Sequence, residues 1–209
     1  MELAELLQKI NADIDARCTA MRWTHDEWLI LTVEFEEPDP ARLIEGLEDL
    51  RFAHDYRQRR FELHCRWPVE AHCRIGEIGS IACEREHPLL LDHVGSQSQL
   101  FFSSVPESAA EVYFTAHKAI ASVLKHWRDP ATVLCHPPER LESALAAGNG
   151  ALARGPDAVI QALERALSGL LRVNAVPVQT FGERTPKLAL TWYQHWIVCD
   201  SVDVVEPTD

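Results

Sequence analysis

An alternation of apolar and polar residues over positions 60–75 constrains the fold more than any other feature of the chain. The apolar positions of this segment are Phe61, Leu63, Cys65, Trp67, Ala71, Cys73 and Ile75. A side-chain period of two is typical of a β-strand with one buried face. Because Pro68 interrupts the run, we predict an antiparallel hairpin that turns there, with its cysteines facing inward and His64 opposite His72 on the outer face.

Other segments carry either the helical or the strand period. Helical spacing of apolar residues predicts helices near residues 3–14, 40–50, 104–127, 138–147 and 156–169. Alternation recurs at residues 29–36 and in the tail beyond residue 170. These patterns predict one α+β domain over residues 1–209, with antiparallel β-hairpins or a sheet packed against about five helices. We expect the glycine-rich link at residues 146–156 to be a mobile joint.

Charge and cysteine content exclude several classes of protein. A formal net charge of -12 argues against sequence-independent binding to nucleic acid phosphates, because such binding needs clustered Lys and Arg. No stretch approaches the ~20 consecutive apolar residues of a membrane span, and the opening residues carry acids where a secretory or transit peptide would not. The six cysteines are scattered, which is typical of free thiols in a reducing compartment, so we expect a cytoplasmic protein without a cofactor.

Acidic residues dominate residues 26–49, where Arg42 is the only basic residue. The candidate partner-binding residues are Glu34, Glu36, Glu37, Asp39, Glu45, Glu48 and Asp49. A negative surface of this kind speeds association with a basic protein and disfavours wrong partners. The sequence therefore predicts a non-catalytic acidic binding domain, of the inhibitor, immunity or assembly-subunit type, that engages a basic protein. Ordinary solubility is the alternative explanation of the same charges.

Histidines and cysteines between residues 64 and 93 raise a second hypothesis, a hydrolase or metal-dependent enzyme. His64 and His72 would be the first two metal ligands, but the expected hairpin offers no third ligand. The segment also lacks the Cys-x2-4-Cys spacing of a structural zinc site. No nucleophile elbow, phosphate-binding loop or dinucleotide fingerprint occurs in the chain. We therefore assign no catalytic residue and no metal, and keep the enzyme as the alternative.

Overall fold

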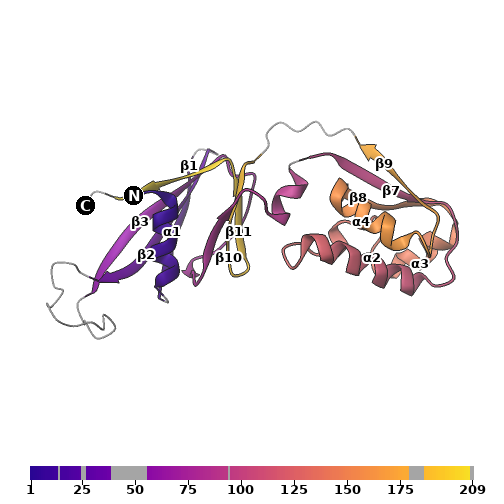
Figure 1. The fold of residues 1–209 in the computed structure, drawn as a ribbon, viewed down its shortest axis with the longest axis horizontal. Helices are drawn as coiled ribbons and strands as arrows, with labels where there is room; N and C mark the ends of the chain where they lie inside the picture. The colour runs from indigo at the N-terminus through magenta and orange to yellow at the C-terminus, as the bar shows by residue number, and fades with distance from the viewer. Residues whose placement is uncertain (14, 25–26, 39–55, 94, 179–185, 208–209) are drawn as a thin grey trace. The chain divides into compact units, whose positions relative to one another are not determined.

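The computed structural model describes residues 1–13, 15–24, 27–38, 56–93, 95–178 and 186–207. Its contacts divide the chain into two compact units (Figure 1). The first unit consists of Met1–Glu86 and Pro186–Asp209, and the second of His87–Thr185. Each unit has a hydrophobic core of its own.

Two antiparallel sheets and one helix form the first unit. The five-stranded sheet has the order β12-β3-β2-β1-β5, and the four-stranded sheet has the order β4-β11-β10-β6. The elements are α1 (Leu3–Ala12), β1 (Arg17–Thr24), β2 (Trp28–Pro38), β3 (Tyr56–Arg66), β4 (Glu70–His72), β5 (Gly76–Glu77), β6 (Ile81–Glu84), β10 (Leu188–Trp192), β11 (His195–Cys199) and β12 (Ser201–Val205). Leu6 and Ile10 of α1 are fully buried in the core that both sheets share.

The hairpin predicted at Pro68 is wrong. β3 and β4 do not pair with each other, because β3 pairs with β12 and β4 pairs with β11. Trp67, which has a φ of 49°, and Pro68 turn the chain from one sheet into the other instead of reversing it. The alternation correctly predicted a strand with one buried face at Phe61, Leu63 and Cys65, but Ala71 and Ile75, expected on the same inward face, are exposed. The C-terminal segment, far away in sequence, supplies a partner for β3 and for β4.

The second unit is a three-stranded antiparallel sheet with helices, in the strand order β8-β7-β9 (Figure 1). Its elements are the 3-10 helix η3 (Pro88–Asp92), β7 (Gln97–Phe102), α2 (Ala109–Leu124), the 3-10 helix η4 (Pro130–Thr132), α3 (Pro138–Ala146), β8 (Gly150–Pro156), α4 (Asp157–Leu167) and β9 (Val173–Val178). Helix α4 packs against all three strands, and α2 packs against α4 and α3. Leu100 and Phe102 of the central strand are buried in this core.

The α+β character that the sequence predicts is present, but the prediction of a sheet packed against about five helices is wrong. The described residues form four α-helices and twelve strands in three antiparallel sheets. The helix expected at residues 40–50 lies outside the described residues. Residues 150–156 of the expected joint form β8, which pairs with β7, and the mobility of residues 146–156 stays a prediction. No helix in the described part of the chain is long and apolar enough to cross a membrane.

Candidate functional site

An acidic recess of about 320 Å³ opens where α1 leads into β1. It is lined by Asp13, Asp15, Arg17, Thr19, Glu34, Phe35, Glu36 and Gln58, and we call it the acidic recess below. Four of these side chains are carboxylates, and Arg17 is the one cation of the set. The recess therefore favours a positively charged group.

Asp13 binds the backbone of β2 at a position where β1 no longer pairs with that strand. β1 begins at Arg17, which pairs with Glu34, so β2 has no β1 partner beyond that position. Asp13 Oδ2 accepts a hydrogen bond of 2.7 Å from the Glu36 amide, and its Oδ1 accepts one of 2.9 Å from the Asp15 amide. With Asp13 bound to the backbone in this way, the exposed carboxylates of Asp15 and Glu36 are left to act on a ligand.

A β-bulge places Thr19 at the recess. The β1–β2 register shifts between Cys18 and Ala20, so Thr19 is the extra residue of β1. Bulges re-aim side chains and are common beside functional sites. The Oγ1 atom of Thr19 is buried and has no hydrogen-bond partner in the structure. Since buried hydroxyls are normally satisfied, this atom is a free donor or acceptor at the wall of the recess.

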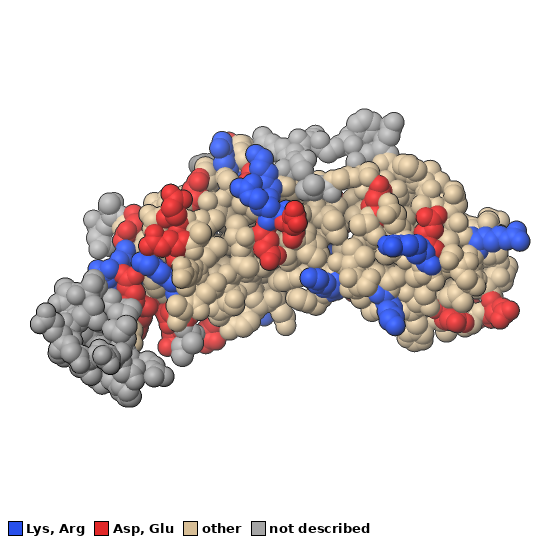
Figure 2. All heavy atoms as spheres, viewed as in Figure 1, with Lys and Arg blue, Asp and Glu red and all other residues tan. Residues whose placement is uncertain are grey.

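The structure describes three of the seven predicted partner-binding residues. Glu34 and Glu36 line the acidic recess, and Glu37 lies next to them on β2. Asp39, Glu45, Glu48 and Asp49 lie outside the described residues. On the visible face of the first unit, acidic and basic side chains are interspersed (Figure 2).

Basic residues of the same unit bind the carboxylate of Glu37. Its carboxylate accepts hydrogen bonds from Arg57, from Arg59 at 2.7 Å and from Lys9 at 3.2 Å. Burial raises the pKa of Glu37, but the hydrogen bonds and charges of these three cations outweigh it and lower that pKa below 4.5. Glu34 is compensated more weakly, by Arg60 at 3.6 Å and Gln58 at 3.3 Å. The predicted acidic edge is thus neutralised in part by β3, which the sequence pattern did not reveal.

Asp13, Asp15 and Thr19 are recess residues that the sequence analysis missed. The two aspartates follow the C-terminus of α1, where the helix dipole disfavours acids. Acidic residues at this unfavourable position could have indicated a functional site from the sequence. Thr19 offered no signal, because the bulge follows from the pairing of β1 with β2.

His64 and His72 are not brought together as predicted. His64 lies on β3 between Ile30 and Asp203, and its Nε2 is 2.8 Å from Glu62 Oε2. This hydrogen bond is the main reason why the pKa of Glu62 is lowered. His72 lies on β4 in the other sheet, where its ring stacks on Trp196 at 4.5 Å. The described residues contain no group of three or more His, Cys, Asp or Glu that could hold a metal ion.

Five of the six cysteines lie in the first unit, and all six are free thiols. A hydrogen bond that the Cys65 thiol donates to Cys199 raises the pKa of Cys65, and burial raises it further, while burial raises the pKa of Cys18 and of Cys83 to about 11. Since the thiolate is the reactive form, these cysteines are poor nucleophiles at neutral pH.

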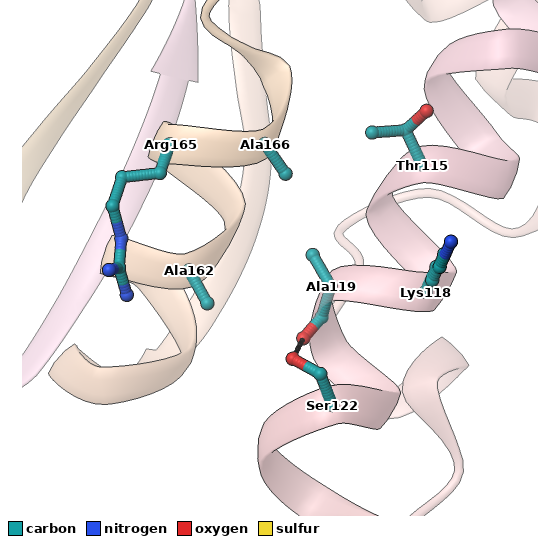
Figure 3. Close-up of a pocket in the computed structure, with 7 residues that line it drawn as sticks. All are labelled: Thr115, Lys118, Ala119, Ser122, Ala162, Arg165 and Ala166. Atoms are coloured by element: carbon teal, nitrogen blue, oxygen red, sulfur yellow. Dashed lines mark hydrogen bonds between the residues drawn. The ribbon is translucent and has the colours of Figure 1, made fainter.

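A groove of about 460 Å³ lies between α2 and α4 in the second unit (Figure 3). Ala119, Ala162 and Ala166 point into the gap between the helices, whereas Lys118 and Arg165 are drawn on the sides of α2 and α4 that face away from it. Thr115 and Ser122 also line the groove, and the Ser122 hydroxyl donates a hydrogen bond of 2.7 Å to the carbonyl of Ala119, so we assign no catalytic role to this groove.

Comparison of the chain with protein-family models, curated proteins and solved structures gives no match. The function is therefore argued from the site alone.

Proposed function

We propose that this chain is a non-catalytic binding protein whose acidic recess receives a basic side chain of a protein partner. One observation carries the proposal: four carboxylates and a buried hydroxyl without a partner surround a concavity that contains a single cation. An inhibitor, an immunity protein or an assembly subunit would use such a recess to hold an arginine or lysine of its target.

The chemistry of the recess fits a guanidinium or an ammonium group. A carboxylate accepts two hydrogen bonds from the planar fork of arginine, and charge-assisted bonds of this kind are stronger than neutral ones. Asp15 and Glu36 are exposed enough to reorient toward an incoming cation, and Thr19 Oγ1 can accept a further hydrogen bond. The net charge of -12 adds a long-range attraction that raises the association rate at low salt.

The alternative of an enzyme that uses residues 64–93 gains no support from the described residues. His64 and His72 lie on different sheets, and the pKa values of Cys65, Cys73 and Cys83 are raised. A cytoplasmic location is also a proposal, which the six free thiols support.

The test compares the double variant D15N/E36Q with the unchanged protein. An oligoarginine peptide and an oligolysine peptide serve as probes, and binding is followed through the backbone amide NMR signals of Thr19 and Glu36. We expect saturable shifts in the unchanged protein and an affinity at least about tenfold lower in the variant, since loss of ~1.4 kcal/mol corresponds to that factor. The difference in affinity between the unchanged protein and the variant should become smaller as salt is added.

The matched control is E139Q/E142Q, which removes two exposed acids from α3 and should leave the affinity unchanged. Equal weakening by both double variants would mean that only net charge matters, and the recess would lose its role. Binding by D15N/E36Q as tight as that of the unchanged protein would overturn the proposal.

A further inference from the structure

Tyr193 occupies a backbone position that normally selects glycine. β10 and β11 are joined by a turn of two residues, Tyr193 and Gln194, because Trp192 pairs with His195. The φ angle of Tyr193 is 48°, in the left-handed region that costs energy for a residue with a Cβ. In short hairpin turns such positions are usually filled by Gly, Asn or Asp.

Burial does not offset this strain, because 60% of Tyr193 is exposed to solvent. Its phenol instead lies against the backbone of Gly79, where a Cβ atom would overlap the ring. Gly79 itself has a φ of 60°, so both residues of this contact have a left-handed backbone. Strained backbone positions are often found at active sites and ligand clamps, so the groups around Tyr193 are candidates for ligand binding.

Tyr193, Gln194, His195 and Arg74 line a recess of about 470 Å³, which we call the turn recess. Arg74 forms no ion pair with any carboxylate among the described residues. The Nδ1 atom of His195 is buried and has no hydrogen-bond partner in the structure, although the ring also bonds to the backbone of His72. The turn recess is therefore lined by a guanidinium that has no ion pair among the described residues and by an imidazole whose Nδ1 has no hydrogen-bond partner there.

The electrostatics of the turn recess favour an anion. Burial lowers the pKa of His195, and the positive charges of Arg74 and His72 lower it further. The ring of His72 lies 6.2 Å from that of His195. An oxyanion bound beside Arg74 would compensate these charges and accept a hydrogen bond from the imidazolium of a protonated His195.

We propose that the turn recess binds a small molecule that carries a carboxylate or phosphate group and a planar apolar part. Arg74 pairs with the oxyanion, His195 donates a hydrogen bond to it, and the ring of Tyr193 packs against the apolar part. Gly79 and the positive φ of Tyr193 hold this ring in place before the ligand arrives. This site is separate from the acidic recess, and it requires a ligand of the opposite charge.

The test titrates the full chain with inorganic phosphate, phenyl phosphate and benzoate, followed by the NMR signals of Tyr193, Gln194 and the His195 imidazole. We expect saturable shifts at these residues with phenyl phosphate or benzoate, and a rise in the pKa of His195 when the ligand is bound. The comparison of the two aromatic probes shows which oxyanion is preferred. Inorganic phosphate should bind at least tenfold more weakly than phenyl phosphate, because it has no part that packs on Tyr193.

Two variants and one control separate binding from folding. R74Q should lower the affinity for the aromatic probes at least tenfold, whereas R140Q, on the exposed surface of α3, should leave it unchanged. Y193G should lower it tenfold while the protein remains at least as resistant to urea, because glycine adopts this φ without strain. Absence of saturable shifts with all three probes would overturn the proposal, as would unchanged affinity of either R74Q or Y193G.

Discussion

The backbone of Gly79 leaves open the space that the phenol of Tyr193 occupies. Gly79 precedes β6, and Tyr193 begins the turn between β10 and β11, so the contact joins two segments more than a hundred residues apart. Both residues have a positive φ, of 60° and 48°. An added Cβ at Gly79 would overlap the phenol, so the ring keeps this position only while residue 79 has no side chain.

Replacing Gly79 by alanine should lower the free energy of unfolding by about 1 kcal/mol, because alanine is strained at a positive φ. The added methyl group should also displace the Tyr193 ring, which changes the tyrosine signals in NMR spectra. Urea denaturation measures the first effect. G169A is the matched control, because nothing lies within 4 Å of the position of its added Cβ, and it should be neutral or slightly stabilising. A G79A protein as stable as the unchanged one, with its Tyr193 signals unmoved, would contradict the contact.

Neutralising Glu37 should destabilise the first unit. Its carboxylate is 13% exposed and binds Lys9, Arg57 and Arg59, so E37Q removes the negative charge that these three cations share. Lys9 keeps Glu5 and Arg59 keeps Glu206 as partners, and the loss of the charge should cost about 1–3 kcal/mol at pH 7. Because the pKa of Glu37 is lowered in the folded state, its contribution is complete above pH 4.5 and is lost as the pH falls through the folded pKa.

The measurement is urea unfolding of the unchanged protein and E37Q between pH 7 and pH 3. The difference between them should narrow below pH 4.5, and E142Q, which removes an exposed acid, should show no difference at any pH. A constant difference across this range would show that the charge of Glu37 does not contribute.

Thiol labelling should distinguish Cys135 from the other cysteines. Cys135 is exposed, whereas Cys18, Cys65 and Cys199 are buried and Cys73 and Cys83 are half-buried. Burial raises the pKa of Cys83 from 9.0 to about 11, which leaves about 100-fold less thiolate at neutral pH. An aromatic disulfide reagent should therefore label one thiol quickly in the native protein, and C135S should remove this fast phase. Rapid labelling of Cys65 or Cys73 would contradict the burial of these thiols.

Removing the Glu164 carboxylate should open the edge of the second unit's sheet. Glu164 on α4 accepts the amide of Ala175 in β9 at 3.2 Å, and Pro177 of the same strand has no amide hydrogen. The edge strands of β-sheets are often protected in this way from pairing with another chain. E164A should speed hydrogen exchange of the Ala175 amide at least about tenfold, since it loses its partner. E142A is the control, and an unchanged exchange rate in E164A would show that Glu164 does not protect the edge.

The sequence by itself determined which faces of β2, β3 and α4 are apolar, although it did not indicate that β1 and β8 are strands. Leu29, Leu31, Val33 and Phe35 of β2, like Phe61, Leu63 and Cys65 of β3, are buried as their alternation predicts. Helical spacing likewise placed Val159, Ile160, Leu163 and Leu167 of α4 in the core. These properties are readable because the side-chain period of an element is local, and one apolar face is enough to reveal it.

Only the tertiary structure decided which strands pair, and the sites depend on that choice. An alternating pattern indicates which face of a strand is buried but not which strand lies beside it. The sequence therefore could not show that β3 pairs with β12 and that β4 pairs with β11. Pairing placed Arg57 and Arg59 beside Glu37 and made Thr19 a bulge, while the β10–β11 turn placed Tyr193 against Gly79. Charge compensation, bulges and strained turns arise between segments far apart in sequence, and for this physical reason the acidic recess and the turn recess were only partly visible in the sequence.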